Sequence, residues 1–135
     1  MEKIHTSYLR QTGGCLGDMA YELRIQYLSV AQEQSWTPAI NGYLCRDCIV
    51  VCVELAGVDK QQIEVRAEPQ RLHLRGLRQP LEENVSCGPL RQVFALEIDQ
   101  GVFQRTVALP LAINPGAVHA EQRNGLLWIS LPLLS

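Results

Sequence analysis

The chain has 135 residues, of which 47% are hydrophobic and 19% are charged, and its formal net charge is −2. This length is typical of one domain with one core, and the balanced charge excludes the basic surface that binding to DNA or RNA requires. The chain contains no run of ~18 apolar residues and no export signal, so we expect a cytoplasmic protein without a membrane partner.

A helix is predicted near the beginning of the chain. Apolar residues recur at Leu16, Ala20, Leu23 and Tyr27, the spacing of one helix face, and Asp18 is a candidate N-cap. A second apolar stripe indicates that this helix packs on its own domain or on another copy. We therefore expect residues 1–35 to form an N-terminal arm with a short amphipathic helix.

After residue 42 the period of the apolar residues changes from helical to two. Residues 49–55, 63–67 and 72–74 alternate between apolar and polar side chains, which is typical of half-buried strands. The links between them are too short for helical crossovers, so the strands are predicted to be antiparallel.

The second half of the chain continues the same pattern. Further strands are predicted over residues 91–98, 102–109 and 117–122. Asn124-Gly125, before the alternating residues 126–131, is the dipeptide of a type I′ hairpin. About seven or eight strands, with turn signals about every 8–12 residues, predict an all-β sandwich or barrel.

Three stretches carry a family resemblance. They are VCVELAGV at 51–58 with LHLRG at 72–76, GVFQRTVALP at 101–110, and AEQRNGLLWISLP at 120–132. In this order they resemble the α-crystallin domain of small heat-shock proteins of the bacterial type. The resemblance implies an immunoglobulin-like antiparallel β-sandwich over residues 36–132.

The same resemblance implies an ATP-independent holding chaperone of the stress response, which binds partly unfolded client proteins and suppresses their aggregation. Such a protein is not an enzyme and needs no cofactor. The residues agree with this expectation, because the chain has no P-loop and no G-x-S-x-G motif, and its three histidines are scattered.

The chain also departs from the family pattern. Ala56 stands where proline is usual, and the sequence ends at Ser135 without the Ile-x-Ile anchor of the family tail. We therefore treat residues 133–135 as a vestigial tail. The missing anchor favours dimers or small assemblies, whereas the apolar helix predicted over residues 18–31 favours further association.

The resemblance also implies a groove between two edge strands for a client or a tail. These strands carry Ile63 and Val65 on one side and Val118 and Ala120 on the other. Trp128 and Leu126 lie on the face opposite residues 127, 129 and 131, where a client or the N-terminal helix would cover them. The alternative is that both belong to the core of a twisted sheet.

Dimerisation by strand exchange is the second implied contact. The segment carrying Val93, Phe94, Leu96 and Ile98 would pair with an edge strand of the partner, and that edge contains Ile40, Tyr43 and Cys45. Exchange would cover both exposed edges. The alternative is a flexible surface loop.

Arg105 shares strand parity with Phe103, Val107 and Leu109, so its side chain is predicted to point toward an apolar face. A buried guanidinium needs a partner, and the candidates are Asp99, Glu97 or a carboxylate of the dimer mate. The alternative is a bulge that turns Arg105 to water.

Five cysteines without regular spacing indicate reduced thiols rather than a disulfide framework. Only Cys45 and Cys48 have the Cys-x-x-Cys spacing of metal ligands, and a structural zinc site needs a second such pair. We expect no metal and mainly core thiols, with redox sensing as the alternative.

Two other functions remain open at this point. The first is a co-chaperone or adaptor domain of the CS type, a monomer that binds one folded partner. The second is a thiol-based redox or metal enzyme, which would require residues brought together from different strands.

Overall fold

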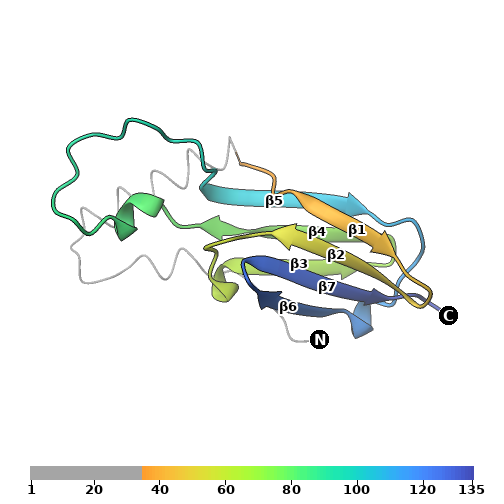
Figure 1. Cartoon of the computed structure of the whole chain (residues 1–135). Coiled ribbons are helices and arrows are strands. Elements are labelled where there is room, and N and C mark those ends of the chain that lie inside the picture. Colours follow the sequence, from red (N-terminus) through yellow and green to blue (C-terminus); the bar gives the residue numbers. More distant parts are fainter. Residues whose placement is uncertain (1–34) are drawn as a thin grey trace.

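The computed structural model of the chain describes residues 35–135 (Figure 1). The helix predicted over residues 18–31 lies outside the described residues. Seven strands and three short 3-10 helices occur in the described part of the chain. The strands are β1 (Ile40–Leu44), β2 (Cys48–Glu54), β3 (Ile63–Glu68), β4 (Arg71–Arg78), β5 (Gly101–Ala108), β6 (His119–Arg123) and β7 (Leu126–Pro132). The 3-10 helices are η1 (Lys60–Gln62), η2 (Leu81–Asn84) and η3 (Pro115–Ala117).

The strands form two antiparallel sheets that pack face to face. One sheet has the order β1-β2-β7-β6 and the other has the order β3-β4-β5. Neighbouring strands in each sheet are antiparallel, as the short links predict. The predicted all-β sandwich is therefore confirmed.

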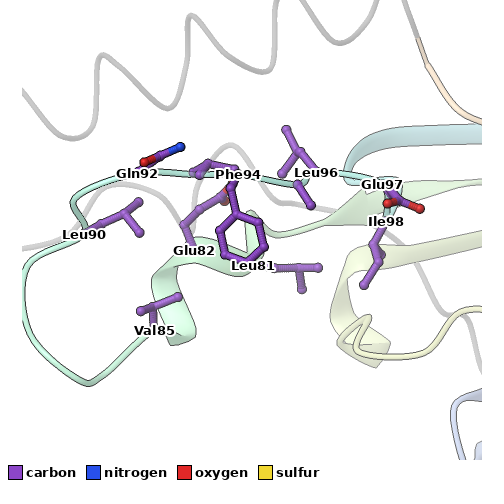
Figure 2. Close-up of a pocket in the computed structure, with 11 residues that line it drawn as sticks. Leu81, Glu82, Val85, Leu90, Gln92, Phe94, Leu96, Glu97 and Ile98 are labelled. Atoms are coloured by element: carbon purple, nitrogen blue, oxygen red, sulfur yellow. The ribbon is translucent and has the colours of Figure 1, made fainter.

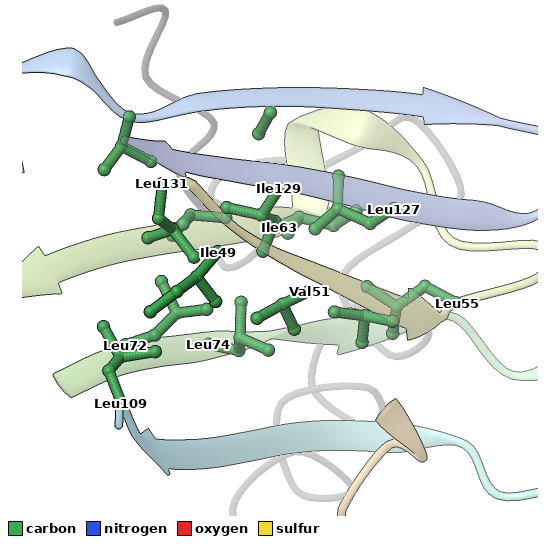
Figure 3. Close-up of a cluster of buried hydrophobic side chains, with 14 of the residues drawn as sticks. Ile49, Val51, Leu55, Ile63, Leu72, Leu74, Leu109, Leu127, Ile129 and Leu131 are labelled. Atoms are coloured by element: carbon green, nitrogen blue, oxygen red, sulfur yellow. The ribbon is translucent and has the colours of Figure 1, made fainter. Parts of the chain in front are cut away.

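The core lies between the two sheets and follows the alternation in the sequence (Figure 3). On β7, Leu127, Ile129 and Leu131 are fully buried, and Leu72 and Leu74 of β4 meet them from the other sheet. Burial of each such side chain stabilises the fold by about 1.5–3 kcal/mol. Because a one-residue slip would turn every one of these side chains to water, the core also fixes the strand register.

Two turns are set by residues with a positive φ angle. Asn124 and Gly125 have φ angles of 53° and 78°, as the predicted type I′ hairpin between β6 and β7 requires. After β2, the Val58 amide donates to the Leu55 carbonyl at 3.1 Å, and Gly57 has a φ of 74°. This second turn supplies the positive φ with glycine, the residue that adopts it without a steric cost.

The prediction of a strand over residues 91–98 is wrong for the single chain. The connection between β4 and β5, residues 79–100, contains η2 and otherwise no regular structure. It projects from one end of the sandwich as the β4–β5 loop (Figure 1). The physical reason is that a strand needs a neighbour for its backbone hydrogen bonds, and the described part of the chain provides none for this segment.

Candidate protein-binding surface

The β4–β5 loop exposes an unusual amount of apolar surface. The exposed fractions are 90% for Phe94, 64% for Leu96 and 63% for Ile98, and Val93 is also exposed. These side chains and η2 line a groove of about 270 Å³, with the Phe94 ring lying between the loop and η2 (Figure 2). Exposed apolar side chains gathered in this way are typical of a protein or membrane interaction site or of a ligand-binding groove, which makes this loop a candidate binding surface.

A buried arginine holds the two ends of the β4–β5 loop together. Arg78 is only 4% exposed, and its Nη1 donates to the Asp99 carbonyl at 2.7 Å while its Nε donates to the Ala56 carbonyl at 3.1 Å. Its guanidinium lies 4.5 Å from the centre of the Trp36 ring, and Nη2 is 3.8 Å from a carboxylate oxygen of Glu54. The loop therefore leaves the sandwich from a fixed base.

Two further contacts reinforce this base. The Leu81 amide donates to Oε1 of Gln100 at 2.9 Å, which joins η2 to the residue before β5. The Trp36 indole donates to the Gly101 carbonyl at 3.2 Å, and Trp36 also forms a parallel bridge with Phe103. No pattern in the sequence points to this role of Arg78, because its partners come from stretches of the chain that are far apart.

Arg105 does not pair with Asp99 or Glu97, the two carboxylates of its own chain that were predicted as partners. The side chain is half-buried and points toward the face of Phe103, as the strand parity predicts. However, its Nη1 donates to the Pro38 carbonyl at 2.9 Å, and no carboxylate of the described residues pairs with it. A backbone carbonyl just before β1 takes the place of these two carboxylates, and pairing of Arg105 with a carboxylate of the dimer mate stays a prediction.

The predicted dimer residues occupy two separate places in the chain. Tyr43 and Cys45 are exposed at the end of β1, whereas Ile40 is half-buried against the core. Strand β1 pairs with β2 on one side only and is an edge strand. It is not paired with residues 91–98, so within residues 35–135 both segments keep unpaired backbone groups.

The predicted groove residues lie on the edge strands of different sheets. Ile63 and Val65 on β3, and Ala120 on β6 with the preceding Val118, are all buried in the core. Their side chains therefore hold the sandwich together, and a client or a tail at this place would meet the backbone edges of β3 and β6. Client binding at these residues stays a prediction.

Leu126 and Trp128 are half-buried on the outer face of β7, opposite the core. The Arg123 guanidinium lies 5.3 Å from the centre of the Trp128 ring. This placement agrees with the expected side of the sheet. It differs from the alternative in which both residues belong to the core.

One arrangement of side chains resembles a catalytic triad in composition. His73 Nδ1 lies 3.2 Å from the Thr106 hydroxyl, and Nε2 lies 3.3 Å from a carboxylate oxygen of Glu68 without forming a hydrogen bond. These residues stand on neighbouring strands at the outer face of a sheet. We assign the arrangement to cross-strand pairing.

The described residues contain no group of three or more His, Cys, Asp or Glu side chains that could hold a metal ion. Within residues 35–135 there is also no helix with the length and hydropathy needed to cross a membrane.

Comparison with known proteins places these features in a family. Residues 45–135 match the family described as "Hsp20/alpha crystallin family". The chain is 30% identical over 80 residues to "Small heat shock protein C2" of Rickettsia felis, which covers 59% of this chain and 49% of that protein. The chain spans about half the length of the curated relatives it matches.

Solved structures agree with the sequence match. "Heat shock protein 16.0" from Schizosaccharomyces pombe superposes with a TM-score of 0.64 at 30% identity, over 75% of this chain and 90% of that chain. The hspA protein from Xanthomonas axonopodis gives a TM-score of 0.63 at 28% identity, over 73% of this chain and 95% of that chain.

Proposed function

The chain belongs to the Hsp20/alpha crystallin family, and from this premise we propose that it is an ATP-independent holding chaperone. It binds partly unfolded proteins through exposed apolar surface and prevents their aggregation. The observation that carries this proposal is the apolar β4–β5 loop, whose side chains at 93–98 face water in the single chain. Unfolded clients expose apolar side chains as well, so removal of both surfaces from water favours the complex.

The proposed active form is a dimer made by strand exchange. Residues 91–98 of one protomer pair with the free edge of β1 in the other, and each segment supplies the backbone hydrogen bonds that the other lacks. This pairing uses backbone groups, so the side chains on one face of the exchanged strand stay available to a client. The sandwich over residues 36–132 is the exchanging domain, and residues 1–35 form a separate arm. Arg78 supports this arrangement because it fixes the base from which the loop reaches the partner.

The proposal places the protein in the cytoplasm, where thiols are kept reduced. The described cysteines Cys45, Cys48, Cys52 and Cys87 are all free. Free thiols are the usual state in that compartment.

The test is suppression of aggregation without ATP. Light scattering of a heat-aggregating model protein is followed with the wild-type chain and with Phe94→Asp, while size-exclusion chromatography with light scattering gives the mass of each. We expect the wild type to be a dimer or larger and to suppress scattering at near-stoichiometric ratios. Phe94→Asp is expected to weaken suppression severalfold, because it places a charge on the proposed contact surface.

Leu111→Asp is the matched control, because Leu111 is also exposed but lies outside the loop. It should behave as the wild type. A monomeric wild type without suppression would overturn the proposal and favour an adaptor that binds one folded partner. Equal suppression by both variants and the wild type would show that Phe94 of the loop does not contribute to the suppression of aggregation.

A further inference from the structure

Cys45 and Cys48 face each other across the turn that joins β1 to β2. The register pairs Leu44 with Ile49, and the next pair outward is Cys45 with Cys48. The Cys45 amide donates to the Cys48 carbonyl at 2.8 Å, so the pairing continues to these two residues. Only Arg46 and Asp47 separate them at the tip of the hairpin.

The spacing of this pair fits a disulfide. The Cα atoms of a hydrogen-bonded antiparallel pair lie about 5.5 Å apart. This value coincides with the commonest Cα separation of protein disulfides, which is about 5.5–6 Å. Because opposite residues of an antiparallel pair project from the same face, both sulfur atoms belong to one side of the sheet.

Both thiols are also accessible from solvent. Cys45 is exposed and Cys48 is half-buried, whereas the next residue of β2, Ile49, points into the core and is buried. The two sulfur atoms therefore belong to the outer face of the sandwich, where a small molecule can reach them.

The other described cysteines have no such partner. Cys52 shares a face with Cys48, but four residues of strand put it roughly 13 Å away, and its cross-strand neighbours are Asn41 and Trp128. Cys87 is exposed in the β4–β5 loop and pairs with no strand. Within the described residues, only Cys45 and Cys48 are held opposite each other.

We propose that Cys45 and Cys48 form a reversible intramolecular disulfide by exchange with a low-molecular-weight disulfide such as oxidised glutathione. The Cys45 thiolate attacks one sulfur of the small disulfide, forms a mixed disulfide and releases one small thiol. The Cys48 thiolate then attacks the Cys45 sulfur and releases the second small thiol. Two protein thiols are oxidised, one small disulfide is reduced to two thiols, and the two thiol protons pass through water to those products.

The site puts an oxidation-sensitive pair of thiols at the end of an edge strand. A disulfide that closes so short a loop constrains the unfolded chain little, so reducing thiols reverse it easily. Such a bond suits a transient oxidation in a reducing compartment rather than a permanent link. The inference does not rest on the proposed chaperone function, because its test detects the bond itself.

The test exploits Arg46, which lies between the two cysteines. The native full chain is equilibrated with oxidised and reduced glutathione, free thiols are blocked with N-ethylmaleimide, and the denatured protein is digested with trypsin without reduction. Cleavage after Arg46 puts Cys45 on the peptide 25–46 and Cys48 on the peptide 47–60. We expect these peptides to be joined, with the mass of two hydrogen atoms lost, and to separate on reduction.

Three variants make the assignment specific. Cys52→Ser should keep the joined peptides, since Cys52 shares the peptide 47–60 but lies too far from Cys45. Cys48→Ser and Cys45→Ser should abolish them and leave a single glutathione adduct on the remaining cysteine. Cys87, on the peptide 79–91, should acquire only such an adduct and serves as an internal reference for an unpaired exposed thiol.

Three results would overturn the proposal. One is a chain in which Cys45 and Cys48 each carry glutathione separately, or stay reduced, while Cys87 reacts. Another is a link from Cys45 to Cys52 or Cys87. The third is a link between Cys45 and Cys48 that forms only in urea, because the fold would then not supply the geometry.

Discussion

Gly76 shows how one residue fixes the packing between β4 and its neighbours. It is buried and pairs with Ile63 on one side and Phe103 on the other. A Cβ atom at this position would lie 2.1 Å from the Gln62 carbonyl oxygen and 2.5 Å from the Phe103 ring. Glycine is required here for close approach, since no positive φ is recorded at this residue.

Gly76→Ala is therefore expected to lower the free energy of unfolding by about 1–3 kcal/mol, the cost of overpacking a core. Urea denaturation followed by tryptophan fluorescence measures the change. Gly42→Ala is the matched control, because Gly42 is also in a strand and has no atom within 4 Å of the added carbon. Equal stability of the two variants would contradict this account of Gly76.

Arg78 makes a second prediction at this scale. Lysine keeps the positive charge but lacks the planar fork that reaches the Ala56 and Asp99 carbonyls together. Arg78→Lys is expected to cost about 1–3 kcal/mol of stability, because a buried ammonium group at this position would lose at least one of the two hydrogen bonds to these carbonyls. The same substitution at exposed Arg75, on the same strand, should change the urea midpoint little; a similar loss at both positions would argue against a special role for Arg78.

The Asn124-Gly125 turn and Arg78 show which kinds of feature can be predicted from the sequence and which cannot. Asn124-Gly125 identifies its hairpin because a local φ requirement selects the residue types. Arg78 carries no such local signal. Arginine side chains are usually exposed, and the two carbonyls that accept from Arg78 are 22 and 21 residues away in the chain, with Trp36 farther still. Local conformation was predictable here, and contacts between distant segments were not.

At the scale of whole elements, the strands of the sandwich were predictable because each pairs within the chain. Alternation located β2, β3, β4 and β7 and identified their buried faces. Residues 91–98 have a strand-like composition but form no strand in the single chain. The prediction failed because composition does not reveal whether a pairing partner is present. This failure coincides with the most exposed apolar part of the described chain.

Hydrogen exchange should reveal whether a partner supplies that missing strand. In a strand-exchanged dimer, the amides of residues 91–98 gain hydrogen bonds and should exchange slowly at high protein concentration. On dilution toward monomer they should lose this protection, whereas the amides of β2, paired on both sides within the chain, should stay protected. Fast exchange of residues 91–98 at every concentration would identify them as a surface loop.

At the scale of the whole molecule, the described residues contain a core that joins both sheets. Its buried members run from Ile49 to Leu131, and Trp36 packs against them. Trp36 also donates its amide to the Val102 carbonyl and accepts from the Gln104 amide at 3.2 Å each. A fragment that begins at Ser35 therefore keeps every core contact described here.

Removal of residues 1–34 is accordingly expected to leave a folded dimer with the same cooperative urea transition, and to weaken the suppression of client aggregation. The core and both exchange segments lie within residues 35–135, whereas the removed arm carries apolar residues that would add to the client-binding surface. Circular dichroism, mass by light scattering and the aggregation assay measure these properties on the same sample. Carrying Leu111→Asp in the fragment controls for handling, because Leu111 is exposed outside β1 and the β4–β5 loop and that change should alter none of the three. An unfolded fragment would show that the sandwich depends on the arm, and a fragment with full activity would assign client binding to the sandwich and its β4–β5 loop alone.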